Sequence, residues 1–213
     1  MSTTVPPERA GMSARDALAR LREGNQRYAQ NVRSVDSLVS HSRRGDLDIQ
    51  WPIAIVLGCS DSRAPAEIVF DQGLGDLFVI RVAGNIVAPS QIGSVEFAAE
   101  RLGTRLVVVL GHTRCGAVTA TLEDLQQSVN QSWNMNSIVS RIRPSVEGLL
   151  ATELKHDRDR LIDAAVRANV RASVNQLRHG SDVLEQLCRR DGLRVVGAEY
   201  ALETGIVDFF DNV

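Results

Sequence analysis

The feature that most constrains this chain is a repeated alternation of short apolar runs with segments of helical pattern. The first run is Ile53-Ala54-Ile55-Val56-Leu57-Gly58, and two more follow at residues 77–82 and 106–110. Each run is rich in β-branched residues and almost continuously apolar, as in strands that are buried on both faces. Between them, residues 66–70 and 91–102 favour helices. This alternation predicts an α/β fold with a mainly parallel central β-sheet flanked by helices.

The regions on either side of these runs extend the pattern. Ser13 is placed to cap a helix from Ala14 to about Gln30, whose apolar residues form a partial stripe. We expect this N-terminal helical arm to pack on the core or on a partner chain. A long helical region is expected at about 134–190, before a closing apolar strand at Leu193–Tyr200 and a turn at 203–205.

Length and composition narrow the class of protein. The 213 residues fit a tail and helical arm at residues 1–50 followed by a single domain at residues 51–213. With 24 Lys and Arg against 26 Asp and Glu, the net charge of −2 argues against sequence-independent nucleic-acid binding. No segment approaches the roughly 18 apolar residues of a membrane span, and no signal-peptide core is present. We therefore expect a cytoplasmic protein with no membrane or nucleic-acid partner.

Three potential metal ligands follow two of the predicted strands. Cys59 comes directly after the first strand, and His112 and Cys115 come after the third. Ligands gather at the carboxyl ends of parallel strands, so these distant segments can converge on one edge of the sheet. Two thiolates and one imidazole form a tetrahedral zinc set that leaves a fourth position for water, as in catalytic sites. The alternative is that the same residues are ordinary members of the core.

Asp61 and Arg63 bear on that fourth position. Asp61 stands two residues after Cys59, close enough to occupy the position itself or to accept a hydrogen bond from a water there. Arg63 could hold the carboxylate away from the metal in a bidentate pair. The remaining cysteine, Cys188, lies at core-like spacing within a predicted helix, and we expect it to be a small buried hydrophobe.

At these residues the sequence resembles the β-class carbonic anhydrases. The resemblance runs from Glu23-Gly24-Asn25-Gln26-Arg27-Tyr28 to Val196-Gly197-Ala198-Glu199-Tyr200 and so covers nearly the whole chain. Its two specific motifs are Cys-x-Asp-Ser-Arg at residues 59–63 and His-x-x-Cys at residues 112–115.

The resemblance implies a zinc site and a reaction. One zinc ion per chain would be bound by Cys59, His112 and Cys115, with an Asp61–Arg63 dyad beside it. The implied reaction is the reversible hydration of carbon dioxide to bicarbonate and a proton by a zinc-bound hydroxide. Because two thiolates make the zinc less electropositive than three histidines would, we expect activity to rise with pH.

The resemblance also assigns substrate-binding residues and an assembly. Gln50 matches a glutamine that is donated across a dimer interface, and Phe78 and Phe97 match the apolar wall of the pocket. Phe97 stands where a tyrosine is common, which removes a hydroxyl and keeps the ring. Gly116 matches the glycine after the last ligand. Family members form dimers that pair into tetramers, with the N-terminal helix reaching over the neighbouring subunit.

One subgroup of the family has a non-catalytic bicarbonate site that this chain matches only in part. That site includes a tryptophan three residues before the first cysteine, and Val56 holds this place here. Arg81 does match the arginine of the same site. We therefore expect the subgroup with an open, water-bearing zinc.

Two further functions are compatible with the same zinc ligands. The resemblance implies that residues 51–213 form a single zinc-binding catalytic domain. In one alternative, the chain is a relative of the family that uses the same zinc site to hydrolyse carbonyl sulfide or carbon disulfide. The other alternative is a non-catalytic zinc-binding protein in which Asp61 permanently closes the metal. Turnover of carbon dioxide by zinc-loaded protein separates these possibilities.

Overall fold

A computed structural model describes residues 12–32, 50–127 and 132–210 of the chain. The expected tail at residues 1–11 lies outside the described residues, as does the 33–49 segment between the arm and the domain. Within the described part, no helix combines the length and the apolar character needed to cross a membrane. The cytoplasmic location stays a prediction.

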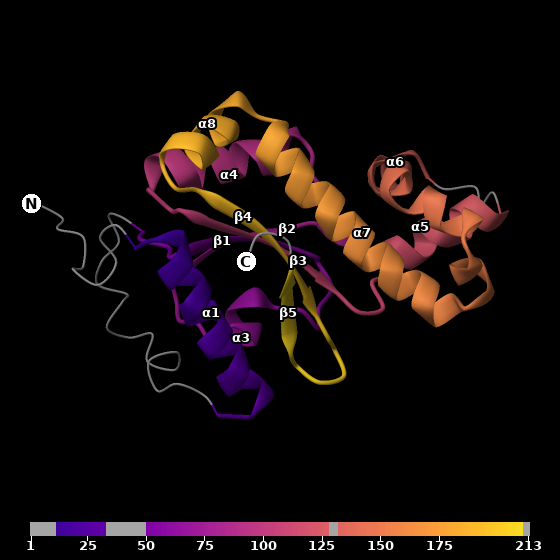
Figure 1. Cartoon of the computed structure of the whole chain (residues 1–213), viewed down its shortest axis with the longest axis horizontal. Coiled ribbons are helices and arrows are strands. Elements are labelled where there is room, and N and C mark those ends of the chain that lie inside the picture. Colours follow the sequence, from indigo (N-terminus) through magenta and orange to yellow (C-terminus); the bar gives the residue numbers. More distant parts are fainter. Residues whose placement is uncertain (1–11, 33–49, 128–131, 211–213) are drawn as a thin grey trace, which may run out of the picture.

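A five-stranded sheet forms the centre of the molecule, with the strand order β2-β1-β3-β4-β5 (Figure 1). Strands β1 to β4 are parallel to one another, and β5 runs antiparallel to β4. The mainly parallel sheet is therefore confirmed, whereas the antiparallel edge strand was not expected. The strands are β1 (Ala54–Gly58), β2 (Leu77–Arg81), β3 (Leu106–His112), β4 (Arg194–Tyr200) and β5 (Val207–Phe210).

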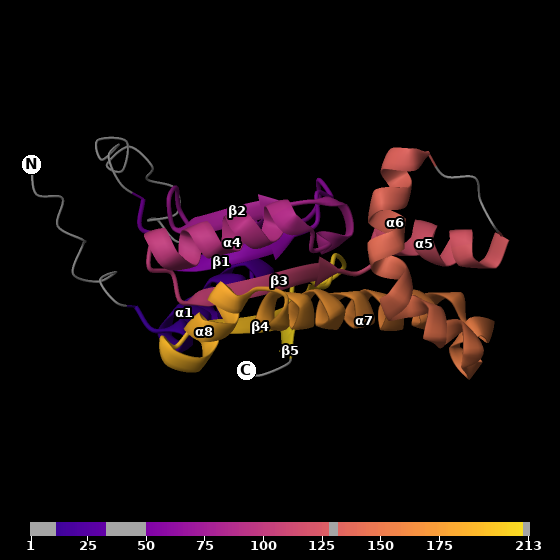
Figure 2. The ribbon, with the colours of Figure 1, turned by 90° about the horizontal axis from the view of Figure 1, so that it is seen from above.

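Helices cover both faces of the sheet (Figures 1 and 2). Helices α1 and α3 lie on one face and α4, α7 and α8 on the other, while α5 and α6 extend beyond the carboxyl ends of the strands. The α-helices are α1 (Ala14–Ala29), α3 (Ala66–Val69), α4 (Pro89–Arg101), α5 (Gly116–Gln127), α6 (Trp133–Val146), α7 (Arg158–His179) and α8 (Asp182–Arg190). The 3-10 helices are η1 (Ala83–Asn85), η2 (Glu147–Ala151) and η3 (Glu153–His156).

The region expected to be one long helical stretch, residues 134–190, is divided into three α-helices and two 3-10 helices. Each α-helix has its own N-cap: the side chains of Ser132, Asp157 and Ser181 accept backbone N–H groups of the first turns. Such caps satisfy N–H groups that have no partner inside the helix, so each one marks a new start. A further helix, α5, follows Cys115 directly and was not expected.

Helix α1 starts where the sequence predicts. The Ser13 hydroxyl accepts the backbone N–H of Asp16 at 3.1 Å, which caps the helix. Its apolar side, including Leu18 and Leu21, is buried in the same core cluster as residues of β1, β3 and β4. The apolar stripe of the arm is therefore used within its own chain.

Two adjacent residues of α1 fasten it to the domain. The Asn25 amide donates to the carbonyl oxygens of Val69 (3.1 Å) and Gly205 (2.8 Å). Its oxygen accepts the backbone N–H of Val207 at 2.8 Å. This buried side chain therefore ties α1 to α3 and to the hairpin between β4 and β5, and it satisfies polar groups that would otherwise be costly to bury. The neighbouring Gly24 lets the helix approach closely.

We predict that Gly24→Ala destabilises the protein by more than about 2 kcal/mol, because the new methyl group overpacks the α1–α3 contact. A Cβ at Gly24 would lie only 1.9 Å from the carbonyl oxygen of Phe70. Gly93 in α4 is the matched control, since a Cβ there meets nothing within 4 Å. Gly93→Ala should stabilise the protein by up to about 1 kcal/mol through helix propensity. Urea unfolding measures both changes, and equal effects would contradict the predicted close approach.

Candidate metal centre

The predicted ligands converge because β1 and β3 are parallel neighbours. Gly58 at the end of β1 lies opposite Leu110 of β3, so Cys59 emerges beside the last residues of β3. His112 is the final residue of β3, and Cys115 follows after a two-residue turn. The three ligand atoms lie within 4.8 Å of one another and could hold one metal ion.

The geometry of this cluster fits zinc. Cys59, His112 and Cys115 are 6%, 0% and 1% exposed, and the two sulfur atoms are 4.0 Å apart. That separation is far too long for a disulfide but close to the ~3.8 Å expected for two thiolates on one tetrahedral zinc. The Nε2 atom of His112 is buried without a hydrogen-bond partner in the described part of the chain. A buried, unpartnered imidazole nitrogen beside two thiols is the donor set that zinc satisfies.

In the absence of metal, the two thiols share their protons unequally. The hydrogen bond from Cys115 lowers the pKa of Cys59 to about 4 against the opposing effect of burial, with help from His112 and Gly84. The same hydrogen bond, together with burial, raises the pKa of Cys115. Burial opposes protonation of His112, but the neighbouring Cys59 sulfur prevails and raises the pKa of the imidazole. Cys59 is therefore the more acidic of the two thiols, and metal binding would displace the proton of Cys115.

Asp61 lies next to the cluster, held aside by Arg63. One carboxylate oxygen accepts the backbone N–H and Nε–H of Arg63, both at 2.9 Å, and the other accepts Nη2–H at 2.8 Å. This second oxygen is still only 3.8 Å from Nε2 of His112. The Arg63 hydrogen bonds hold the pKa of Asp61 well below its usual range. The arrangement keeps the carboxylate ionised and beside the metal position without placing it on the metal.

The loop that carries Cys59 is braced by residues that sequence reasoning did not assign to the cluster. The backbone N–H of Gly84 in η1 donates to the Cys59 sulfur at 3.4 Å. Gly84 has a φ of 69°, which favours glycine, and its carbonyl accepts the Asn169 amide of α7 at 2.8 Å. Arg81 donates to the carbonyl oxygens of Cys59 (3.0 Å) and Asp61 (2.6 Å). In the sequence, the pair Gly84-Asn85 shortly after a strand is a pattern that indicates this turn.

A second brace fixes the turn between His112 and Cys115. The Nδ1 atom of His112 lies 2.9 Å from the carbonyl oxygen of Thr113, so Nδ1–H donates there and Nε2 is left to bind metal. Glu203, between β4 and β5, accepts the Thr113 hydroxyl at 3.1 Å and pairs with Arg114 at 3.0 Å. Arg114 has a φ of 56°, so the turn is sharp and strained for its residue type. The sequence showed Glu203 only as part of a turn, with no sign of this role.

Three of the four residues expected to line the substrate pocket lie away from the metal cluster of their own chain. Gln50 is exposed and precedes β1, whereas Cys59 follows it, so the five-residue strand separates them by roughly 17 Å. Phe78 in β2 and Phe97 in α4 are neighbours, with ring centroids 6.3 Å apart, and Phe97 is 50% exposed. Gly116 directly follows Cys115, and a Cβ there would meet nothing within 4 Å. Only Gly116 of these four adjoins the cluster within one chain.

Val56 and Cys188 lie in other parts of the structure. Val56 is fully buried in the middle of β1. Cys188 lies in α8 as expected, but it is half-buried and packs at the margin of the core. It takes no part in the metal cluster formed by Cys59, His112 and Cys115.

We predict that Glu203→Ala weakens zinc binding about tenfold, because loss of a residue that orients the ligands typically costs 10- to 100-fold in affinity. Glu123→Ala is the matched control: the two carboxylates are 47% and 46% exposed, and each pairs with one arginine. Competition with a chromogenic chelator measures both affinities. Equal zinc affinities in the two variants would show that the turn needs no support from Glu203.

Comparison with known proteins gives a consistent result over most of the chain. The sequence pattern of the family described as carbonic anhydrase matches residues 54–207. The chain is 38% identical to the carbonic anhydrase of Mycolicibacterium smegmatis over 188 residues, which covers 88% of this chain and 89% of that protein. It is 35% identical to carbonic anhydrase 2 of Mycobacterium tuberculosis over 195 residues, covering 91% of each.

The folds agree as well. The β-carbonic anhydrase CafA of Aspergillus fumigatus superimposes with a TM-score of 0.72 at 27% identity, over 92% of this chain and 90% of that one. The part that matches the family pattern, residues 54–207, contains the whole metal cluster. The relatives align with this chain over nearly their whole length. This chain belongs to the β-carbonic anhydrase family, whose members use zinc to hydrate carbon dioxide.

Proposed function

We propose that this chain catalyses the reversible hydration of carbon dioxide to bicarbonate and a proton, with zinc bound by Cys59, His112 and Cys115. The observation that carries the proposal is the position of Asp61. Both of its oxygens are engaged by Arg63, and one of them lies 3.8 Å from the metal-binding nitrogen of His112. A structural zinc site would have a fourth protein ligand at this point.

Zinc, when bound, lowers the pKa of a coordinated water to about 7 and so supplies a nucleophile at neutral pH. Asp61 accepts a hydrogen bond from the attacking water and orients its lone pair toward carbon dioxide. Arg63 keeps that acceptor ionised and in place through its three hydrogen bonds. Since the pKa of Asp61 is depressed, its carboxylate would be protonated only far below pH 6.5. A rise of activity with pH above 6.5 therefore does not come from Asp61.

The substrate-binding residues are proposed to come partly from a second copy of the chain. Gln50, Phe78 and Phe97 all lie away from the metal cluster of their own chain. Phe78 lies in β2 and Phe97 packs against it; β2 forms one edge of the sheet, and its four apolar residues, 77–80, are only half-buried. A dimer that covers this edge would bury these side chains and bring them toward the partner's site. Assembly beyond a dimer stays a prediction.

In this arrangement each residue has a separate task. The Gln50 amide donates a hydrogen bond to an oxygen of carbon dioxide or bicarbonate. Phe78 and Phe97 keep the pocket narrow and apolar, which suits a small nonpolar substrate. Gly116, next to Cys115, leaves room for the substrate because it has no side chain. Arg81 donates to the carbonyl oxygens of Cys59 and Asp61. These hydrogen bonds favour the loop conformation in which Asp61 pairs with Arg63 and does not bind the metal.

Carbon dioxide hydration by zinc-quantified protein, followed by stopped flow between pH 6.5 and 9, tests the proposal. We expect turnover well above the buffer rate, rising with pH. Asp61→Asn should keep its zinc and lose about 100-fold or more in turnover at every pH, since a neutral amide replaces the ionised acceptor and cannot accept both Arg63 hydrogen bonds. Asp124→Asn is the control, because Asp124 is also a partly buried carboxylate paired with an arginine.

The possible results separate the alternatives. Faster hydrolysis of carbonyl sulfide than hydration of carbon dioxide would replace the proposed substrate. One zinc per chain without turnover at any pH would show that the metal is closed and the site structural. Full activity in a zinc-loaded Asp61→Asn variant would refute the role given to Asp61.

Complementation between variants tests whether Gln50 acts in the partner's site. Gln50→Ala and Asp61→Asn chains are each expected to be nearly inactive alone. When they are co-expressed, a mixed dimer contains one site with an intact cluster and an intact Gln50, so random pairing should restore about a quarter of the wild-type activity. Asp61→Asn mixed with Arg63→Gln is the control, because both changes lie at the same cluster and restore nothing. Equal behaviour of the two mixtures would place Gln50 in the site of its own chain.

A further inference from the structure

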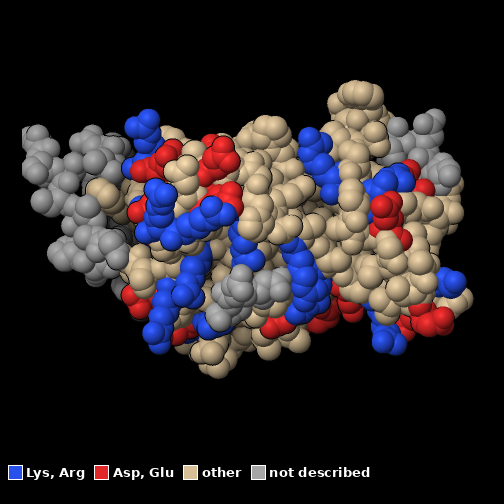
Figure 3. Space-filling model, turned by 45° about the horizontal axis from the view of Figure 1, so that its top comes forward, with Lys and Arg blue, Asp and Glu red and all other residues tan. Residues whose placement is uncertain are grey.

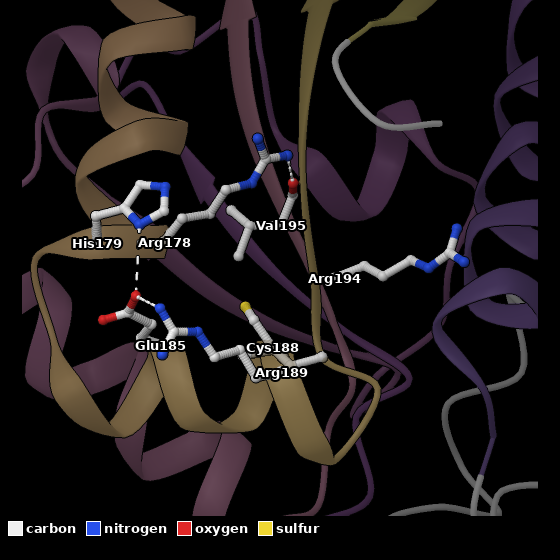
Figure 4. A pocket seen from close by; sticks show the side chains of 8 residues that line it. Arg178, His179, Glu185, Cys188, Arg189, Arg194 and Val195 are labelled. Atoms are coloured by element: carbon white, nitrogen blue, oxygen red, sulfur yellow. Dashed lines mark hydrogen bonds and ion pairs between the residues drawn. The ribbon is translucent and has the colours of Figure 1, made fainter.

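A cavity of about 530 Å³ lies at the end of the sheet opposite the metal cluster. It opens to solvent and is bordered by the last residues of α7, the facing side of α8 and the start of β4 (Figure 4). This volume is within the range of pockets that bind drug-sized molecules. The catalytic proposal uses none of the residues that line it.

The cavity is separate from the metal centre by the length of β4. Arg194 and Val195, the first residues of β4, line the cavity. Tyr200 at the other end of the same strand lies opposite the zinc ligand His112. Six residues of strand span about 20 Å, so a small molecule in the cavity cannot touch the metal cluster.

Two arginines give the cavity a positive wall. Arg178, at the end of α7, donates through Nη2 to the carbonyl oxygen of Val195, which fixes its guanidinium over the edge of β4. Arg189 of α8 pairs with Glu185 at 2.5 Å, and His179 lies 3.9 Å from the same carboxylate. Glu185 is the one acidic group among the residues that line the cavity. The guanidinium of Arg194 points away from the others and toward α1 in Figure 4, so it is not counted here.

The other wall of the cavity is apolar. Leu193 and Val195 lie beneath it in the core between the sheet and α8 and, at 3% and 2% exposed, present little surface themselves. Cys188 of α8 is half-buried beside them, and its thiol is uncharged because burial raises its pKa. An apolar surface opposite guanidinium groups suits a molecule with a flat, weakly polar body and an anionic group at one end.

The surrounding surface is consistent with such a ligand. Figure 3 looks onto this side of the molecule and shows Lys and Arg side chains gathered over the part that contains α8, with Asp and Glu among them. A mixed surface of this kind does not attract polyanions such as nucleic acids, which require a continuous basic face. The recognition of an anion must therefore come from the cavity itself.

We propose that this cavity is a binding site for a small phosphorylated molecule with a flat ring, of the size of a nucleoside monophosphate. Its phosphate lies between Arg178 and Arg189, where guanidinium groups make paired hydrogen bonds to phosphate oxygens. Its ring lies against Cys188, above the buried side chains of Leu193 and Val195. The proposal is independent of the catalytic one, because it uses neither the metal cluster nor Asp61.

Calorimetric titration of the zinc-loaded protein with three compounds tests the chemistry. AMP carries both the ring and the phosphate, adenosine carries the ring alone, and inorganic phosphate carries the anion alone. We expect AMP to bind at least about tenfold more tightly than either fragment, because only AMP uses both walls. Absence of AMP binding, or binding of inorganic phosphate as tight as that of AMP, would overturn the proposal.

A matched pair of variants tests the location. Arg189→Gln should weaken AMP binding about tenfold or more, since a hydrogen bond to a charged group is lost. Arg158→Gln is the control: the two side chains are 73% and 71% exposed, and each pairs with one glutamate. Carbon dioxide hydration should be the same in both variants, which shows that each is folded. AMP binding that survives in Arg189→Gln, or that is lost equally in Arg158→Gln, would contradict a site between α7, α8 and β4.

Discussion

The parallel pairing of β1 with β3 is the constraint on which the rest of this structure depends. Their register places Gly58, the last residue of β1, opposite Leu110, two residues before the end of β3 at His112. A shift of one residue would turn the side chains of a strand to the opposite face and break the burial of both core layers. The hydrophobic pattern of two central strands therefore sets the distance between Cys59 and His112, although 53 positions separate them in the sequence.

Two loops outside the strands position the buried metal cluster. Glu203 approaches the His112 turn from the loop between β4 and β5, and Gly84 approaches Cys59 from the turn after β2. Glu203 acts on the side chains of Thr113 and Arg114, and Gly84 acts on the Cys59 sulfur, so neither contact occupies the position where substrate would react. Asp61 is held in a similar way, because both of its carboxylate oxygens accept hydrogen bonds from Arg63. Preorganised ligands with an accessible fourth position are what separates a catalytic metal site from a structural one.

Periodicity predicted the elements that bury continuous apolar runs, and it failed where tertiary contacts decide. Strands β1, β3 and β4 are almost wholly buried, so their sequences are distinctive. Strand β5 has only four residues, and it is held at the sheet edge by pairing with β4 and by the Asn25 side chain of α1. No local pattern contains that information. The same is true of Glu203, whose partners Thr113 and Arg114 are about 90 positions away in the chain.

Motif spacing was a better guide to the metal ligands than to the substrate pocket, for a physical reason. Metal ligands need fixed distances of about 2 Å to one ion, which places them on the ends of rigid strands and leaves a spacing that can be recognised. The roles proposed for Gln50, Phe78 and Phe97 impose no such fixed distances, and in one chain these residues lie apart from the cluster. In the proposed dimer, the surface of a second chain would account for their positions.

Helix α7 connects the two ends of the sheet and shows how they can serve different ligands. Asn169 near its middle holds Gly84 and thus the Cys59 loop, while Arg178 near its end borders the distant cavity. Between them, Val170 packs so closely on β3 that a Cβ at Gly111 would lie 2.5 Å from it. A helix packed this tightly does not slide gradually, because buried interfaces move between discrete arrangements or not at all. Occupancy of the cavity would therefore reach the metal centre only through a concerted shift of α7, and side-chain adjustments around a ligand would remain local.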